Sequence, residues 1–337
     1  MRRAIRSLIL SNYSRLGLIL AITAISLYLV MREATLQEIW HVLQQVNWVW
    51  IGLALATMLV NILLKAMRWR VLLGQPGENL CFRSIFMSLV AGQYLNMLYP
   101  ARVGDISRVY VIGGLGAGRA YTLGTVLVEK ILDLIAYSSL FLLLVVLMPL
   151  PAWVSDSGYT FTLIVLVVCL GVVVMTLRRE WFLGLLERML SWLPGRLLGY
   201  TIERLRSGLA SLEMLQARGK LYQLAVWTAL IWWVAVLTNQ LTILALDLSL
   251  PIKASILVLI LLQAGITIPS VPGRVGVFEA ICLVALGMFA VEQATALSFG
   301  ILLHGVVLMP TLLIGIISSW ILGLGNRALE AEERRSV

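Results

Sequence analysis

Residues 96–105 read Asn-Met-Leu-Tyr-Pro-Ala-Arg-Val-Gly-Asp, and a looser copy recurs at 269–279 as Pro-Ser-Val-Pro-Gly-Arg-Val-Gly-Val-Phe-Glu. Both copies contain Pro-x-Arg-Val-Gly, with Arg102 and Arg274 at matching positions, and both place a carboxylate shortly after this motif. Both also lie in apolar sequence, where a proline breaks a helix and an arginine is costly to bury. The two copies therefore predict two interrupted apolar segments.

The composition indicates an all-α, polytopic integral membrane protein. Of 337 residues, 60% are hydrophobic and only 13% are charged, whereas an ordinary soluble domain has about 25% charged residues. The net charge of +9 does not indicate nucleic-acid binding, because the basic residues cluster beside apolar stretches rather than on a soluble face. The three cysteines show no metal-binding or disulfide pattern, and we expect no cofactor and no metal.

The apolar stretches predict about six full membrane spans, since about 20 apolar residues cross the hydrocarbon core. The connections assigned to the cytoplasm carry nineteen basic residues and those assigned to the outside carry two. This bias places the N- and C-termini in the cytoplasm and fits the cytoplasmic (plasma) membrane of a cell. The first stretch is interpreted as a retained signal anchor. The six predicted spans are 8–30, 48–67, 121–149, 159–177, 221–246 and 296–322.

Two further apolar stretches each contain one copy of the motif. If either crossed the membrane as one straight helix, the charge bias of all later loops would collapse. We therefore expect two re-entrant helical hairpins, entering from opposite faces, in an inverted-topology repeat. The predicted division of the single membrane domain 1–337 is repeat one at 48–177 with hairpin 80–118, a cytoplasmic amphipathic linker at 178–220, repeat two at 221–322 with hairpin 252–292, and a cytoplasmic tail at 323–337.

Two segments outside the spans show amphipathic patterns. Leucine and isoleucine recur at helical spacing within 181–219, which predicts one amphipathic helix along the cytoplasmic interface. Thr35 and Glu38 have the spacing of a capping box, which predicts the start of a short helix.

Four motifs in order resemble the lysylphosphatidylglycerol synthase transmembrane family, also called flippase-like, over nearly the whole chain. The resemblance implies an eight-segment membrane domain with inverted repeats, associated with moving lipids between leaflets. The motifs are Lys65-Ala66-Met67-Arg68-Trp69-Arg70-Val71-Leu72-Leu73, Asn96 with Pro100-x-Arg102-x-Gly104-Asp105, Val128-Glu129-Lys130-Ile131-Leu132-Asp133, and Pro269-x-x-Pro272-Gly273-x-x-Gly276-x-x-Glu279.

The chain departs from this family pattern in two respects. Glu129-Lys130 stands where the family usually has Glu-Arg, which weakens a bidentate role for the basic residue. No soluble aminoacyl-transferase domain follows the membrane region up to Val337. We therefore expect no lysyl-lipid synthesis, and the resemblance leaves the transported lipid open.

Arg102 and Arg274 are the strongest candidates for binding a lipid phosphate. A broken hairpin exposes helix ends beside a fixed guanidinium, and both groups suit a phosphate. The alternative is that each arginine only neutralises its nearby carboxylate, Asp105 or Glu279, and so holds the hairpin together. The residues expected to break the hairpins are Pro100, Gly104, Pro269, Pro272, Gly273 and Gly276.

Glu129 and Asp133 are one helical turn apart and share a face, with Lys130 turned aside. They are expected either to partner Arg102, Arg108 or a lipid amine, or to bind a coupling proton. The alternative is a structural ion-pair network that holds the first hairpin. Asn96 is also expected to support the phosphate site or its coupling.

Other polar residues near or within the spans have simpler explanations. Lys65, Arg68 and Arg70 are expected to reach anionic headgroups at the membrane surface, with direct lipid capture as the alternative. His304 is expected to be a hydrogen-bonded packing residue rather than a proton relay. The polar residues expected to form interhelical hydrogen bonds are Asn61, Asn239, Gln240 and Gln263.

These patterns together predict a translocase that moves a phosphate-bearing lipid, either a phospholipid or a polyprenyl lipid, between leaflets. The expected partners are membrane lipids, with a lipid-modifying enzyme or a second copy of the chain as further possibilities, and no nucleic acid. The chain is not expected to be an enzyme, because no catalytic set is recognisable. The alternative is an accessory membrane protein that scaffolds a lipid-modifying enzyme or a glycosyltransferase through the segment 181–219.

Overall fold

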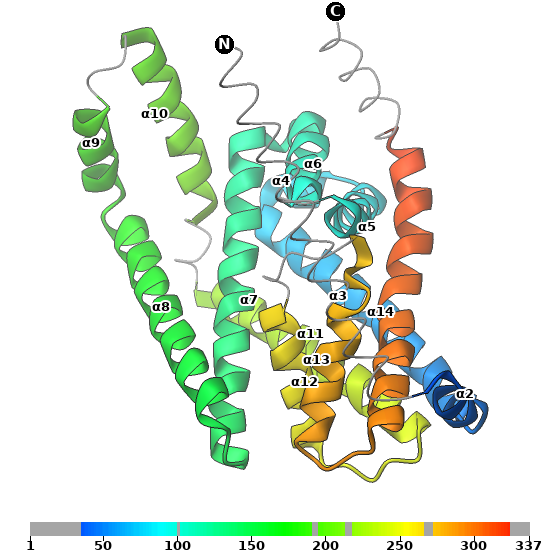
Figure 1. The fold of residues 1–337 in the computed structure, drawn as a ribbon. Helices are drawn as coiled ribbons and strands as arrows, with labels where there is room; N and C mark the ends of the chain where they lie inside the picture. Colours follow the sequence, from blue (N-terminus) through cyan, green and yellow to red (C-terminus); the bar gives the residue numbers. More distant parts are fainter. Residues whose placement is uncertain (1–34, 100–101, 191–194, 213–217, 266–271, 324–337) are drawn as a thin grey trace, which may run out of the picture. The chain divides into compact units, whose positions relative to one another are not determined.

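A computed structural model describes residues 35–99, 102–190, 195–212, 218–265 and 272–323, and the described residues contain helices and no strands (Figure 1). The all-α class predicted from composition is therefore confirmed. The helices are α2 (Leu36–Gln44), α3 (Trp48–Leu73), α4 (Gln75–Asn79), α5 (Phe82–Leu98), α6 (Val103–Ile112), the π-helical turn η1 (Gly113–Ala117), α7 (Arg119–Leu147), α8 (Ala152–Leu177), α9 (Arg179–Met189), α10 (Gly195–Ala210), α11 (Arg218–Ala245), α12 (Ile252–Gly265), the 3₁₀ turn η3 (Pro272–Arg274), α13 (Val277–Gly287) and α14 (Gln293–Ile321).

Five helices, namely α3, α7, α8, α11 and α14, are long and apolar enough to cross a membrane. Each of them overlaps one of the spans predicted from the sequence. The first predicted span, 8–30, lies outside the described residues. The protein is thus a membrane protein with multiple apolar helices, as the composition indicated.

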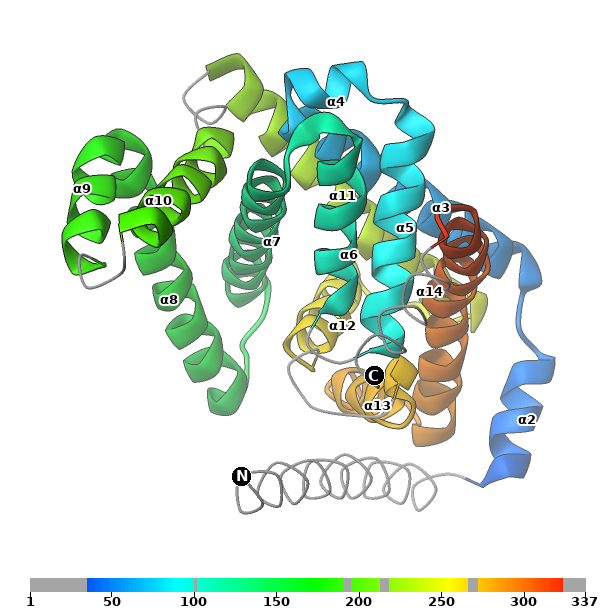
Figure 2. The same ribbon diagram turned by 90° about the horizontal axis from the view of Figure 1, so that it is seen from above.

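Both apolar stretches that contain the motif form a helix, a break and a second helix. In the first, α5 and α6 lie side by side (Figure 2), and the contacts of Gly92 with Arg108 and of Asn96 with Gly104 show that the two helices run antiparallel. In the second, α12 is followed by η3 and α13, which packs against it. Neither stretch is one straight helix. Their re-entrant paths and the inverted repeat stay predictions from the charge distribution.

The helices divide into two compact units, and each unit contains one copy of the motif. One unit comprises Met1–Leu59 and Val234–Pro310, and it includes the second hairpin. The other comprises Val60–Trp233 and Thr311–Val337, and it includes the first hairpin. The boundaries of the two units fall within α3, α11 and α14. The division into two repeats stays a prediction from the sequence.

The segment predicted as one amphipathic helix over 181–219 forms two helices instead. Figure 1 shows α9 following α8, and α10 turning back along α7. The prediction of a single helix was wrong because Pro194 precedes Gly195, where α10 begins, and a proline lacks the N–H and has a ring that opposes a continuous helix. α10 packs on α7, where Gly124 lies against the Gly208 carbonyl and Ser211.

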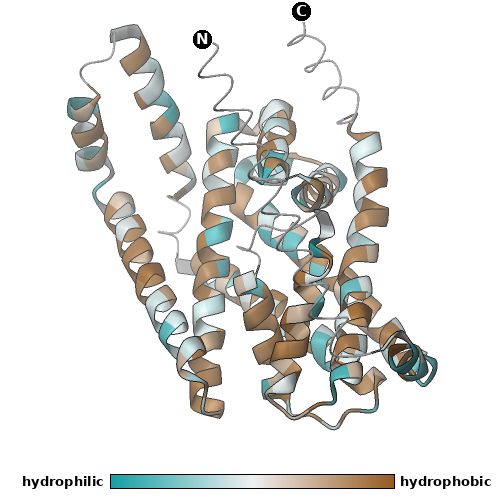
Figure 3. Ribbon diagram, in the orientation of Figure 1, coloured by the Kyte–Doolittle hydropathy of each residue, from teal (hydrophilic) through white to brown (hydrophobic). Residues whose placement is uncertain are grey.

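Apolar residues cover most of α8 (Figure 3), and many of their side chains are exposed. A soluble protein rarely exposes a contiguous apolar face of this size, so this surface is typical of contact with lipid. The exposed side chains on this helix include Leu163, Ile164, Leu166, Val167 and Leu170.

Three of the polar residues predicted to join helices do so. Asn61 on α3 donates from Nδ2 to the Ile231 carbonyl on α11 at 2.6 Å. Asn239 on α11 donates to the carbonyl of Ser255 on α12 at 3.1 Å. Gln240 Oε1 accepts from the Ser255 hydroxyl on α12 at 2.6 Å, and its Nε2 donates to the Leu250 carbonyl, just before α12, at 3.1 Å. These bonds satisfy amides that apolar surroundings would otherwise leave unpaired.

The capping box predicted before α2 is also confirmed. The Glu38 amide donates to the Thr35 hydroxyl at 3.3 Å, and the Thr35 amide donates to the Glu38 carboxylate at 2.9 Å. The sequence identified this helix start because a capping box joins residues only three positions apart.

Candidate functional site

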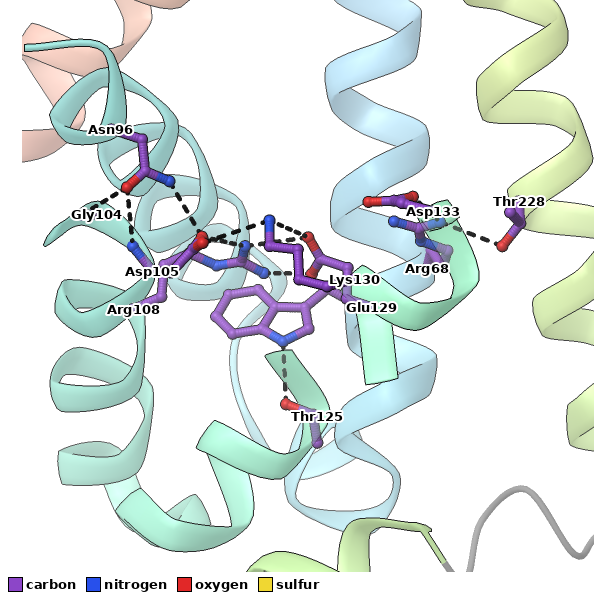
Figure 4. A network of polar contacts seen from close by, with 11 residues as sticks. Arg68, Asn96, Gly104, Asp105, Arg108, Thr125, Glu129, Lys130, Asp133 and Thr228 are labelled. Atoms are coloured by element: carbon purple, nitrogen blue, oxygen red, sulfur yellow. Dashed lines mark hydrogen bonds and ion pairs between the residues drawn. The ribbon is translucent and has the colours of Figure 1, made fainter. Parts of the chain in front are cut away.

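Asn96, near the end of α5, caps the start of α6 across the break of the first hairpin. Its Oδ1 accepts hydrogen bonds from the amides of Gly104 at 2.8 Å and Asp105 at 3.3 Å. Its Nδ2 donates to Asp105 Oδ1 at 3.1 Å (Figure 4). Two amides that an open helix end would offer to a phosphate are therefore already occupied. The amides of Gly104 and Asp105 are therefore not open to a phosphate, contrary to the prediction that this helix end offers them.

Gly104 and Gly92 allow α5 and α6 to approach at backbone distance. A Cβ placed on Gly104 would overlap the Gly92 carbonyl, and a Cβ placed on Gly92 would lie 2.6 Å from the Arg108 side chain. Small residues at helix contacts permit this approach in membrane proteins. Gly104 was predicted to break the hairpin, but it lies within α6 and its role is to allow close packing.

Arg108 on α6 is the centre of a buried polar network (Figure 4). Its Nη1 and Nη2 donate to the two carboxylate oxygens of Glu129 on α7 at 3.2 Å and 2.6 Å. Nη1 also lies 3.6 Å from Asp105 Oδ1. The guanidinium stacks 4.0 Å from the ring centroid of Trp69, whose Nε1 donates to Thr125. This two-pronged pairing fixes the orientation of α6 against α7.

Lys130 completes this network from α7. Its Nζ lies 3.5 Å from Asp105 Oδ2 and 3.8 Å from Glu129 Oε1. The two cations and the two carboxylates carry charges that cancel. The sequence named Arg108 only as one of several expected partners of Glu129 and Asp133, and its position three residues after Asp105 on one helix face was a signal that favoured it.

Asp133, one turn after Glu129, pairs with a different helix. Arg68 on α3 donates from Nη1 to Asp133 Oδ1 at 2.8 Å and to the Thr228 hydroxyl on α11 at 3.2 Å (Figure 4). The Arg68 side chain is 1% exposed, so the expectation that it reaches a lipid headgroup was wrong. The buried guanidinium points inward, where Asp133 supplies its counter-charge.

The other two basic residues of that motif are half-buried. Arg70 donates from Nε to the Gly77 carbonyl at 3.3 Å, and Lys65 lies one turn before Trp69 on α3. A contact of either residue with headgroups stays a prediction. Glu129 and Asp133 tie α7 to α6 and to α3, as the structural alternative expects. The binding of a coupling proton or a lipid amine by these carboxylates stays a prediction.

Arg102 is exposed and immediately precedes α6, with a φ of 54° in the left-handed region. It is not the cation that neutralises Asp105, because that carboxylate is paired with Arg108 and Lys130. Among the residues that the structure describes, Arg102 takes part in no ion pair. Pro100 of the same motif lies outside the described residues.

The second motif copy is held by Glu279 and His304. Glu279 Oε2 accepts from the Gly276 amide at 2.7 Å, and Glu279 Oε1 lies 2.7 Å from His304 Nδ1 on α14. His304 Nε2 lies 2.7 Å from the Gly273 carbonyl in η3. The expectation that His304 is a hydrogen-bonded residue is confirmed. Pro269 lies outside the described residues, and Pro272 begins η3.

The two motif copies share one backbone feature. Arg274, with a φ of 60°, adopts the same left-handed conformation as Arg102, and each arginine closely precedes a helix. Holding a residue other than glycine in this region costs about 1–3 kcal/mol, and such strain clusters at functional sites. In the second copy the neighbouring glycines, Gly273 and Gly276, also have positive φ values of 77° and 88°.

The family model for the lysylphosphatidylglycerol synthase transmembrane region matches residues 16–315, which include both motif copies and both polar networks. The chain belongs to this family. Membership of the lysylphosphatidylglycerol synthase transmembrane family indicates a membrane protein related to lipid handling. A comparison with curated proteins found no match.

Proposed function

We propose that this family member is a translocase that moves a phosphate-bearing lipid between the leaflets of the cytoplasmic membrane, with both termini in the cytoplasm. The observation that carries this proposal is the exposed, left-handed Arg102 at the break of the first hairpin. Its expected carboxylate partner, Asp105, is already neutralised by Arg108 and Lys130.

Charge balance supports an anionic ligand for Arg102. The network of Arg108, Lys130, Asp105 and Glu129 is neutral in sum, so Arg102 adds a positive charge that this network does not compensate. A cation at the depth of an interrupted membrane segment is costly without a counter-charge. A lipid phosphate supplies that charge, and its oxygens match the two-pronged guanidinium.

Arg274 is the proposed second phosphate contact, reached from the opposite leaflet. The acyl or isoprenoid chains stay in the bilayer while the headgroup crosses from one leaflet to the other. Rocking of one repeat against the other alternates the access. The partners of the protein are then membrane lipids, and the protein rearranges no covalent bond.

The test is lipid translocation in proteoliposomes, measured with fluorescent phospholipids and polyprenyl phosphates. Replacing Arg102 or Arg274 with alanine should lower the initial rate about tenfold or more, because a hydrogen bond to a charged group contributes about 1.5–3 kcal/mol. Arg102→Lys keeps the charge but not the guanidinium fork, and it should retain part of the activity.

The matched control is Arg188→Ala, which removes an exposed arginine from α9, a helix that contains neither motif copy. This control should translocate lipid at the wild-type rate. Equal rates for wild type, Arg102→Ala and Arg274→Ala would refute the proposed site.

A second candidate function, a scaffold for a lipid-modifying enzyme, is favoured by one feature of α9. Trp181, Leu185 and Met189 are spaced four residues apart, share a face and are exposed. Replacing all three with serine should abolish the function in cells under the scaffold hypothesis, while Arg102→Ala stays active. The translocase hypothesis predicts the reverse ranking.

A further inference from the structure

His304 on α14 lies between two hydrogen-bond acceptors. Its Nε2 is 2.7 Å from the Gly273 carbonyl oxygen, and its Nδ1 is 2.7 Å from Glu279 Oε1. The Phe278 ring stacks on the imidazole with centroids 4.4 Å apart and an angle of 13° between the planes. The side chains of Glu279 and His304 are only 10% and 11% exposed.

The chemistry of these groups fixes the number of protons in the pair. A carbonyl oxygen can only accept, so His304 Nε2 must carry a hydrogen. The short contact between Nδ1 and Oε1 also requires a hydrogen, which belongs either to the imidazole or to the carboxyl group. In both cases the pair holds one proton more than a neutral histidine beside a carboxylate.

Loss of that proton would remove a hydrogen bond from the motif. A neutral His304 has one N–H, which can serve either Gly273 or Glu279 but not both. The Gly273 carbonyl and the Gly276 amide lie on either side of Arg274, and they are held by His304 and Glu279 respectively. Binding of the proton therefore determines whether both hydrogen bonds of His304 stabilise the left-handed turn that contains Arg274.

Several other charged or titratable groups lie on the segments around the pair. Cys282 faces the same side as Glu279, since a Cβ on Gly300 of α14 would lie 3.2 Å from both residues. Arg274 is half-buried beside Gly273. The other charged or titratable groups on the elements packed nearby are Glu38 and His41 on α2 and Lys253 on α12.

We propose that Glu279 and His304 form a proton-binding site, and that its occupancy is coupled to movement of the second hairpin and so to lipid translocation. The coupling rests on the function proposed above, whereas the proton site does not. One proton binds from water and returns to water, with no covalent or redox change. A proton gradient across the membrane would then supply energy for moving the lipid.

Nuclear magnetic resonance tests the proton site directly, because the chain has only two histidines. His41→Gln removes the exposed one on α2, and ¹⁵N-histidine labelling then reports His304 alone. Spectra recorded over a range of about pH 5 to 9, which brackets the ordinary ionisation of imidazole, should show one proton-linked change in its ring nitrogen signals, because loss of the shared proton leaves a single ring N–H. Glu279→Gln should abolish this change, because a glutamine amide can donate permanently to Nδ1. An unchanged His304 spectrum over this range in the Glu279-containing protein would overturn the proposal.

Proteoliposomes with an imposed pH gradient test the coupling. Reversing the gradient should change the wild-type translocation rate several-fold, and the rate of Glu279→Gln should not respond. Arg102→Ala should lose translocation but keep the His304 titration, which separates a failure of the phosphate site from a failure of the proton site. If the wild-type translocation rate is the same under both gradients although His304 changes its protonation, the coupling is refuted.

Discussion

Replacing Arg108 with alanine should lower the free energy of unfolding by about 3–5 kcal/mol, because it leaves buried carboxylates without their main cation. The guanidinium is 2% exposed, donates to both oxygens of Glu129 and lies against Trp69. Its loss removes the principal link between α6 and α7. Thermal or denaturant unfolding of the purified protein in detergent measures the change.

Two variants provide the controls for Arg108→Ala. Arg119→Ala removes an exposed arginine from the same region, one that stacks over Tyr110 at 4.6 Å, and should cost no more than about 1 kcal/mol. Arg108→Met combined with Glu129→Leu removes both charges, so it should be much less destabilising than Arg108→Ala alone. A loss below about 1 kcal/mol for Arg108→Ala would show that the network does not hold the hairpin.

Adding a single methyl group at Gly104 should be as damaging as losing the ion pair. The new Cβ would overlap the Gly92 carbonyl, and a backbone atom cannot turn aside as a flexible side chain can. Overpacking costs about 1–3 kcal/mol and occasionally more, and we expect at least about 3 kcal/mol here. Separation of α5 and α6 would also pull Asn96 away from the amides it caps.

Gly114→Ala is the matched comparison for Gly104→Ala. Gly114 lies in η1, ten residues further along the chain, and a Cβ placed there meets no atom within 4 Å. We expect a change within about 0.5 kcal/mol, as for most surface substitutions. Unfolding midpoints and the yield of monodisperse protein measure both variants, and equal behaviour of the two would contradict the close contact of α5 and α6.

The apolar helices and the positions of their breaks could be predicted from the sequence because both are local properties. About 20 consecutive apolar residues are enough to indicate a span, and five of the predicted spans are long apolar helices in the structure. The two Pro-x-Arg-Val-Gly copies mark the breaks between α5 and α6 and between α12 and α13. The capping box of Thr35 and Glu38 was predictable for the same reason.

The partners of the charged residues could not be predicted in the same way. Glu129 had several cations within possible reach, and only the packing of α6 on α7 selects Arg108, which is 21 positions away in the chain. The sequence predicted that Arg68 reaches the membrane surface, because nothing in the local pattern indicates its partner Asp133, which is 65 positions away. The separation of α9 and α10 near Pro194 likewise allows α10 to pack on α7.

The sequence alone determined that this is an all-helical membrane protein of this family, with two broken hairpins that each carry an arginine. Hydropathy and helix-breaking residues act over a few turns of one chain segment, so a linear pattern is enough to identify them. Only the tertiary structure decided that Arg108 pairs with Glu129 and that His304 bridges Glu279 and Gly273. The physical reason is that ion pairs and hydrogen bonds depend on distances of about 3–4 Å between residues that lie far apart in the chain.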